Sequence, residues 1–262
     1  LLLRQIDGDK WQAMARPARK LRQGEKLTIV DRRGQESSYS AVVEHKDDDG
    51  TVTLSVPDIN SVLARAGQVP LPHYITETLS DVERYQTVFA REPGSVAAPT
   101  AGLHFTDEIL GHLRESGIEI AWVTLHVGPG TFQPVKVEDA MQHQMHAEQY
   151  LVGEETLEML RGALRERRRV IAVGTTSCRT LEAISGDIEE KGSLKGETSL
   201  YITPGYQFKV VSGLLTNFHL PKSTLLLLVS AFAGRESVLR SYSEAVAERY
   251  RFYSFGDAML IL

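Results

Sequence analysis

The segment Val69-Pro70-Leu71-Pro72 divides the chain into two parts with different residue patterns. Neither a helix nor a central strand continues through it, because proline lacks the backbone N–H that both require. Before it, short runs of alternating apolar and polar residues predict strands at residues 11–15, 26–30, 39–44 and 51–56. With a predicted helix over residues 58–66, this pattern leads us to expect a small β-barrel-like domain over residues 1–70.

The part over residues 71–262 alternates between helices and strands, which indicates an α/β domain. Helices are predicted at residues 80–90, 106–116, 154–168, 176–185, 223–233 and 236–250. Strands are predicted at residues 118–127, 170–173 and 207–211. The helix over residues 223–233 is apolar on nearly every side, so we expect it to be buried.

Composition excludes several classes of protein. With 42% hydrophobic and 24% charged residues, the chain is globular rather than intrinsically disordered. A lone cysteine, Cys178, excludes a disulfide scaffold and favours a reducing cytoplasm. We interpret Cys178 as a small buried residue rather than a reactive thiol. The longest apolar run is far shorter than a membrane span requires.

The net charge of −5 argues against a protein coated in positive charge, so any contact with nucleic acid depends on local patches. One basic patch lies between two predicted strands and consists of Arg16, Arg19, Lys20 and Arg22. A second patch, over residues 161–169, is interpreted as solvated surface, since basic residues late in a helix suit its dipole.

Four segments combine glycine or proline with hydroxyl groups and a cationic or imidazole side chain: residues 99–105, 126–132, 174–179 and 216–223. Each lies at a predicted strand end or helix start, where open α/β sheets bind ligands. The N–H groups and hydroxyls of Gly174 to Ser177 suit an anion, but equally well cap a helix. Lys222 lies near a predicted helix N-terminus, so a bound anion or nearby carboxylate would explain it.

Histidines are the candidate proton-transfer groups. His104, His126 and His219 lie in these segments, and His146 follows the second of them. A neutral imidazole accepts a proton near pH 7, although a structural hydrogen-bonding role is as plausible for each. No metal site is expected, because the chain has neither a His-Glu-x-x-His motif nor a Cys-x-x-Cys pair.

Long runs of this sequence resemble the S-adenosylmethionine:tRNA ribosyltransferase-isomerase (QueA) family of queuosine biosynthesis. They read ERYQTV (83–88), GSVAAPTAGLHFT (94–106), VGTTS (173–177), TNFHLPKSTL (216–225) and YRFYSFGDAM (250–259). The resemblance covers nearly the whole chain. The family has a further N-terminal section with an Asn-Asp-Thr-Arg motif that is not present in the sequence, so we expect a longer protein.

The resemblance implies an α/β domain carrying the active site and a β-barrel-like domain inserted into it. It implies that the ribosyl part of S-adenosylmethionine is transferred to, and rearranged on, 7-aminomethyl-7-deazaguanine in a tRNA anticodon. The product is epoxyqueuosine, and adenine and methionine are released. S-adenosylmethionine is then a co-substrate with no permanently bound cofactor, and we expect a cytoplasmic monomer.

In that reaction we expect His104, His126 and His219, with His146 behind them, to transfer protons. The expected S-adenosylmethionine contacts are Thr100, Gly102, Phe105, Gly128, Gly130, Phe132, Gly174, Thr175, Thr176, Asn217, Phe218 and Lys222. We expect the patch at Arg16, Arg19, Lys20 and Arg22 to contact tRNA phosphates. The alternatives are a tRNA-binding module without chemistry and a methyltransferase, the latter disfavoured by the missing glycine-rich fingerprint.

Overall fold

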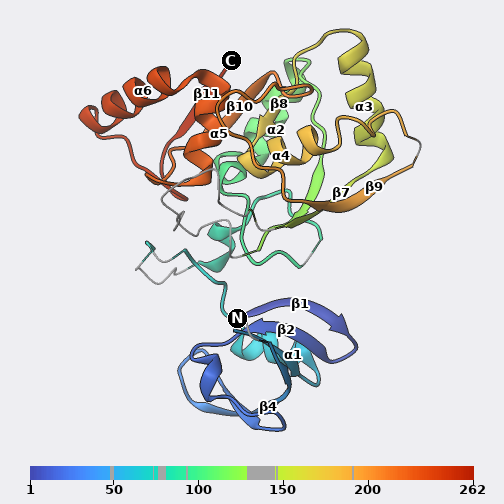
Figure 1. Cartoon of the computed structure of the whole chain (residues 1–262), viewed down its shortest axis with the longest axis vertical. Coiled ribbons are helices and arrows are strands. Elements are labelled where there is room, and N and C mark those ends of the chain that lie inside the picture. Colours follow the sequence, from blue (N-terminus) through green and yellow to red (C-terminus); the bar gives the residue numbers. More distant parts are fainter. Residues whose placement is uncertain are drawn as a thin grey trace. The chain divides into compact units, whose positions relative to one another are not determined.

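The computed structural model describes residues 1–47, 50–72, 74–75, 81–92, 94–128, 145, 147–190 and 192–262 (Figure 1). The chain forms two compact units, each described by itself below. The first comprises Leu1–Glu77 with Gly94–Val96, and the second comprises Thr78–Pro93 with Ala97–Leu262. Three of the expected site residues, Gly130, Phe132 and His146, lie outside the described residues.

The first unit is built on one five-stranded antiparallel sheet in the order β1-β2-β5-β4-β3. The strands are β1 (Leu2–Asp7), β2 (Lys10–Met14), β3 (Lys26–Val30), β4 (Glu36–Lys46) and β5 (Thr51–Ser55). The helix α1 (Ile59–Ala66) follows β5 and ends at Gly67, as predicted. Its Val62 packs with Ala41 and Val56 in a small apolar core.

The second unit contains two three-stranded sheets. In one, β10 (Gly213–Asn217) lies between the parallel strand β8 (Ile171–Val173) and the antiparallel strand β11 (Ala258–Ile261). The other is antiparallel, with β7 (Glu148–Val152) between β6 (Val123–His126) and β9 (Leu194–Thr198). The helices are α2 (Asp107–Glu115), α3 (Glu154–Arg165), α4 (Thr175–Ala183), α5 (Thr224–Ala233) and α6 (Arg235–Ala247), with 3-10 turns η2 (Val82–Tyr85) and η3 (Thr100–His104).

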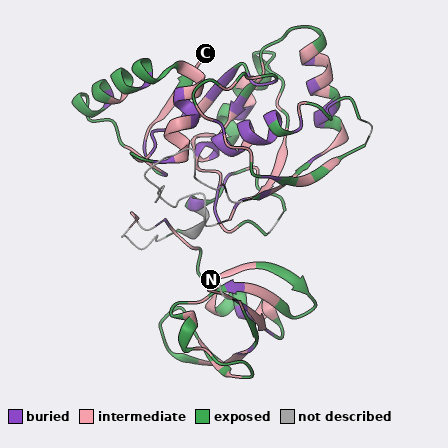
Figure 2. Ribbon diagram, viewed as in Figure 1, coloured by how far each residue is buried: buried purple, intermediate pink, exposed green. Residues whose placement is uncertain are grey.

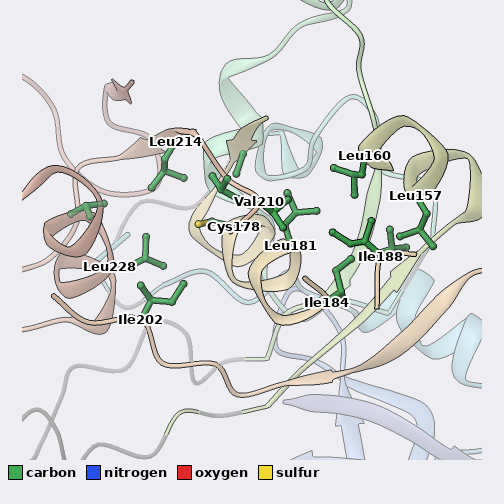
Figure 3. Packing of buried hydrophobic residues seen from close by; sticks show 14 of the residues in the cluster. Leu157, Leu160, Cys178, Leu181, Ile184, Ile188, Ile202, Val210, Leu214 and Leu228 are labelled. Carbon is green, nitrogen blue, oxygen red and sulfur yellow. The ribbon is translucent and has the colours of Figure 1, made fainter. Parts of the chain in front are cut away.

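Helix α4 is the centre of the hydrophobic core of this unit, and most of its residues are buried (Figure 2). Leu181 and Ile184 pack with Leu157 on one side and Leu228 of α5 on the other (Figure 3). In α5, Leu228 to Ser230 are fully buried and the other residues are partly so, which agrees with its apolar sequence. No helix within the described ranges is long and apolar enough to cross a membrane.

The strand predicted at residues 207–211 is wrong. The N–H groups of Val210 and Val211 donate to the Glu182 carboxylate of α4, at 3.0 and 2.8 Å, instead of to a neighbouring strand. The sheet begins only at Gly213, with β10. The apolar run over residues 207–211 is therefore a loop and not a strand. Its backbone N–H groups can be buried because the Glu182 carboxylate accepts their hydrogen bonds.

Two other predicted elements are shorter than expected. Within the described part of residues 80–90, the only helical element is η2. The predicted strand at residues 118–127 contains only β6. Before β6, the Trp122 N–H donates to the Thr156 hydroxyl at 3.3 Å, and this hydroxyl donates to the Trp122 carbonyl at 2.8 Å. A side chain therefore takes the place of a neighbouring strand there.

Replacing Glu182 by Gln should destabilise the second unit. Glu182 also accepts from the Lys209 N–H at 2.9 Å and the Tyr206 hydroxyl at 3.2 Å. In the glutamine variant, an NH2 group replaces one carboxylate oxygen and cannot accept from the two donors on that side. We therefore expect a loss of about 3 kcal/mol in the free energy of unfolding. Urea titration followed by circular dichroism measures this loss.

The exposed Glu189 provides the matched control, because Glu189→Gln makes the same chemical change on the surface. Its unfolding midpoint should equal that of the parent protein. Equal midpoints for both variants would show that the Glu182 carboxylate does not stabilise the fold.

Candidate active site

The carboxyl ends of the parallel strands β8 and β10 bring two of the sequence segments together. Val173 pairs with Leu215, and the Gly174 N–H donates to the Leu215 carbonyl at 2.8 Å. Gly174 has a φ of 91°, which lets the chain turn sharply from β8 into α4. The first turn of α4 and Asn217, at the end of β10, therefore lie at the same edge of the sheet, where α/β folds bind ligands.

The turn η3 brings the third segment to this edge. His104 Nε2 lies 3.3 Å from Asn217 Nδ2, although the two residues are 113 positions apart in the chain. A side chain on Gly174 would lie 3.7 Å from the Ala101 Cβ, so η3 also lies beside the start of α4. The N–H of Ala97 donates to the Val127 carbonyl at 3.2 Å, which ties the approach to η3 to the end of β6.

Gly102 allows η3 to pack where it does. A Cβ at this position would lie 2.8 Å from Thr87 Cγ2 and 2.9 Å from Phe89 Cζ, closer than carbon atoms tolerate. Gly102 was expected to contact S-adenosylmethionine. That contact stays a prediction, and the close packing of Gly102 sets the position of η3, the turn that ends with His104.

Asn217 is buried, and its amide nitrogen is well satisfied. Nδ2 donates to the Tyr253 carbonyl at 2.9 Å and lies 3.4 Å from the Ser254 carbonyl. Its Oδ1 atom is buried and has no hydrogen-bond partner among the described residues. A buried polar atom of this kind is a common feature of functional sites.

Burial lowers the pKa of His104 below its usual value, and the positive charge of Arg251 acts in the same direction. The carboxylate of Asp257 opposes both. Asp257 is itself held by Arg251, whose backbone N–H and Nη2 donate to it at 2.7 and 3.1 Å and lower its pKa. The His104 imidazole is therefore neutral near pH 7.

His219 lies on the other face of β10. Its Nε2 is 3.0 Å from the hydroxyl of Thr216, and its backbone N–H donates to the Tyr242 hydroxyl at 2.8 Å. Because successive side chains of a strand point to opposite faces, Thr216 and the His219 ring lie opposite Asn217 and His104. Burial lowers the pKa of His219 to about 3.

Phe218 and Lys222 lie in the segment that follows β10. Phe218 is 5% exposed and packs against Tyr242, Tyr250 and Phe252, with ring centroids 5.0–5.9 Å apart. The expected contact of Phe218 with S-adenosylmethionine stays a prediction. Lys222 is exposed, and the following Ser223 caps α5 by accepting from the Leu226 N–H at 3.3 Å.

The first turn of α4 has no side-chain cap, and its Thr175 and Thr176 are buried. One turn further on lies Arg179, which ends the segment 174–179 but was not among the expected site residues. It is 2% exposed, and its Nη2 forms an ion pair with Glu148 at the start of β7. Its Nε and Nη1 atoms have no hydrogen-bond partner within the described ranges. The sequence could have indicated Arg179 as a site residue, because it is a charged residue on a helix face that the apolar pattern predicts to be buried.

The remaining expected residues lie in three places. Thr100 begins η3 and Phe105 follows it, and both are partly buried. His126 and Gly128 lie at the end of β6, also partly buried. The residues Arg16, Arg19, Lys20 and Arg22 belong to the first unit and are all exposed, around the 3-10 turn η1 (Ala18–Lys20).

The second basic patch is partly engaged in protein contacts. Arg161 pairs with Glu154 at 2.7 Å, and Arg168 pairs with Glu119 at 2.9 Å. Cys178 is fully buried, and burial raises the pKa of its thiol to about 12, which confirms its interpretation as a packing residue. In the part of the chain that the structure describes, no three His, Cys, Asp or Glu side chains gather to hold a metal ion.

Comparison with known proteins identifies the class. The model of a family described as "Queuosine biosynthesis protein" matches residues 1–261. The chain therefore belongs to the queuosine biosynthesis protein family, and the resemblance read from its sequence is confirmed.

Two curated relatives are named S-adenosylmethionine:tRNA ribosyltransferase-isomerase. That of Staphylococcus haemolyticus (strain JCSC1435) is 48% identical over 264 residues, which is 100% of this chain and 76% of the relative. That of Clostridioides difficile (strain 630) is 47% identical over 263 residues, again 100% and 76%. The crystal structure of S-adenosylmethionine tRNA ribosyltransferase from Thermotoga maritima aligns with a TM-score of 0.52 and 36% identity, covering 100% of this chain and 74% of that one.

Replacing Gly102 by Ala should displace η3 and carry His104 away from Asn217. Overpacking of this kind costs about 1–3 kcal/mol of stability. The matched control is Gly111→Ala in α2, where a Cβ meets no atom within 4 Å. That change should stabilise by about 0.5–1 kcal/mol, because alanine favours helix more than glycine does. Thermal unfolding of both variants checks the pair, and a stabilised Gly102→Ala would contradict the packing described here.

His219 should make the stability of the fold fall at acid pH. Its pKa is about 3 in the folded chain and about 6.5 in an unfolded one, so between these values only the unfolded chain binds the proton. Relative to His219→Gln, the parent protein should lose about 2 kcal/mol between about pH 7 and about pH 5. Urea titrations at several pH values measure the difference, and parallel pH profiles would contradict it.

Proposed function

We propose that this protein transfers the ribosyl moiety of S-adenosylmethionine to 7-aminomethyl-7-deazaguanine in a tRNA anticodon and isomerises it there. The products are epoxyqueuosine in the tRNA, free adenine and methionine. The observation that carries this proposal is the family match over residues 1–261, with relatives of that activity about 48% identical over the whole chain. The enzyme is thus a tRNA ribosyltransferase-isomerase.

The reaction needs groups that move or hold protons. The positive sulfur of S-adenosylmethionine acidifies the protons on the ribose 5′ carbon, and the departing adenine needs a hydrogen-bond donor. We assign these tasks to the edge where His104, Asn217 and the start of α4 meet, because it combines a neutral imidazole with buried polar groups. His126, at the end of β6, and His146 are retained as further candidates for proton transfer.

His219 receives a structural role in this proposal. Its ring is buried beside Thr216, whose side chain points to the face of β10 opposite Asn217. Phe218 is likewise assigned to the aromatic cluster that supports β10, and Lys222 to the surface. Phe105 and Phe132 remain assigned to the adenine or the sulfonium group.

We propose that the start of α4 binds the carboxylate of the methionine moiety of S-adenosylmethionine. The N–H groups of Thr175 and Thr176 have no side-chain cap there, and a helix N-terminus favours an anion. Arg179 adds a buried positive charge one helical turn away, with two nitrogen atoms unpaired among the described residues. Thr100, Gly128 and Gly130 are assigned to the same substrate.

We propose that the first unit, as well as the active site, binds the tRNA. The exposed side chains of Arg16, Arg19, Lys20 and Arg22 surround η1 and make no ion pair within the described ranges. They are therefore available for phosphates. We assign residues 1–70 as a β-barrel-like domain inserted into an α/β domain that includes residues 71–262. We further propose a cytoplasmic monomer that works without a resident cofactor.

The proposal predicts that the protein releases adenine from S-adenosylmethionine only when tRNA carrying the aminomethyl-deazaguanine is present. The acceptor base should gain the mass of the rearranged ribosyl group. Chromatography of free adenine and mass spectrometry of nuclease-digested tRNA measure the two products. Tight tRNA binding without either product would favour a binding module, and S-adenosylhomocysteine in place of adenine would favour a methyltransferase.

His104→Ala should lower kcat for adenine release on the order of 100- to 1,000-fold, because an essential hydrogen-bonding or proton-transfer group is lost. The control is His112→Ala, which changes an exposed histidine of α2. It should leave kcat unchanged. If both variants react like the parent protein, the active site lies elsewhere.

A further inference from the structure

The orientation of the Asn217 side-chain amide is fixed by its partners. Nitrogen and oxygen of an amide look alike in shape, so the hydrogen-bond network decides which is which. The carbonyl oxygens of Tyr253 and Ser254 lie 2.9 and 3.4 Å from the terminal atom of one amide arm. Carbonyl oxygens only accept, so this arm must be the NH2 group.

This orientation determines the tautomer of His104. The same Nδ2 atom lies 3.3 Å from His104 Nε2, and it brings hydrogen atoms to that contact but no lone pair. One amide hydrogen serves the Tyr253 carbonyl, and the other points to His104. Nε2 must therefore accept, and a neutral imidazole that accepts at Nε2 carries its hydrogen on Nδ1.

The charged groups around His104 agree with a neutral ring. Burial and Arg251 lower its pKa, and the opposing carboxylate of Asp257 is already held by Arg251 through two hydrogen bonds. A protonated ring would direct an Nε2 hydrogen against the hydrogens of the Asn217 amide. The contact with Asn217 thus excludes the imidazolium as well as the other tautomer.

We propose that Asn217 is a positioning residue that holds His104 as the Nδ1–H tautomer, so that His104 donates a hydrogen bond to the substrate through Nδ1 instead of acting as the general base. This inference rests on the proposed function for the identity of the substrate. The acceptor on the substrate is then a sugar oxygen or a purine ring nitrogen. Proton removal from the 5′ carbon falls to another group, and His126 is the described candidate.

The tautomer can be read directly from the protein by nuclear magnetic resonance. In long-range proton–nitrogen spectra of histidine-labelled protein near pH 7, His104 should show a protonated Nδ1 and an unprotonated Nε2. The His104→Gln spectrum identifies its signals by their absence. A protonated Nε2, in either the other tautomer or the imidazolium, would overturn the proposal, and this measurement requires no enzymatic activity.

Variants of Asn217 test its part in holding the tautomer. Asn217→Ala removes the donor, so the His104 signals should shift toward the Nε2–H form. The control is Thr216→Val, the adjacent strand residue on the opposite face, which should leave the His104 signals in place. Should Asn217→Ala unfold, the spectrum of the parent protein still decides the question. An unchanged tautomer in folded Asn217→Ala would show that Asn217 does not set it.

Two conservative replacements of His104 separate a donor from a base. The amide nitrogen of asparagine reaches the position of the imidazole Nδ1, whereas that of glutamine reaches the position of Nε2. His104→Asn should therefore retain at least about ten times more adenine release than His104→Gln. If both variants are equally inactive while the parent protein releases adenine, the donor role is wrong and the proposed function stands. If the parent protein releases no adenine, the proposed function fails and the spectra still report the tautomer.

Discussion

The buried carboxylate of Glu182 is the interaction on which the geometry of the second unit depends. From the last turn of the core helix α4 it accepts from three consecutive backbone N–H groups, those of Lys209, Val210 and Val211, and from the Tyr206 hydroxyl. A carboxylate removed from water requires such compensation. In return it fixes the loop that leads into β10, and through β10 it fixes Asn217. The edge of the sheet at Asn217 is thereby fixed relative to the buried helix α4.

The two histidines that lie near β10 in the structure, His104 and His219, have different surroundings. His219 is two residues from Asn217, yet it contributes to packing, since its ring bonds Thr216 and remains neutral to about pH 3. His104 comes from a distant part of the chain and meets Asn217 directly. Distance along the chain therefore did not indicate which histidine contacts Asn217, because adjacent side chains of β10 point to opposite faces.

Local structure was predictable where short-range rules act. The helix α2 starts with Thr106, whose hydroxyl accepts from the Ile109 N–H at 3.2 Å, and α1 ends at Gly67. The turn at Gly174 followed from its position between strand and helix. The strand β10 was not predicted, because the loop over residues 207–211 before it has the apolar pattern of a strand. Only the hydrogen bonds from this loop to the distant Glu182 show that it is not one. Without β10, the faces of Asn217 and His219 were not predictable. The pairing of Arg179 with Glu148, 31 positions apart, was equally invisible.

The alternation of side chains in β10 has a consequence for how this enzyme tolerates change. The Thr216 side chain contacts His219 on one face of β10, and the Asn217 side chain contacts His104 on the other. A slip of one residue in the pairing with β8 and β11 would exchange the two roles at once. Insertions and deletions in this strand should therefore be lethal to both folding and turnover. Substitutions, in contrast, act on one layer at a time, so stability and chemistry can be adjusted independently from neighbouring positions.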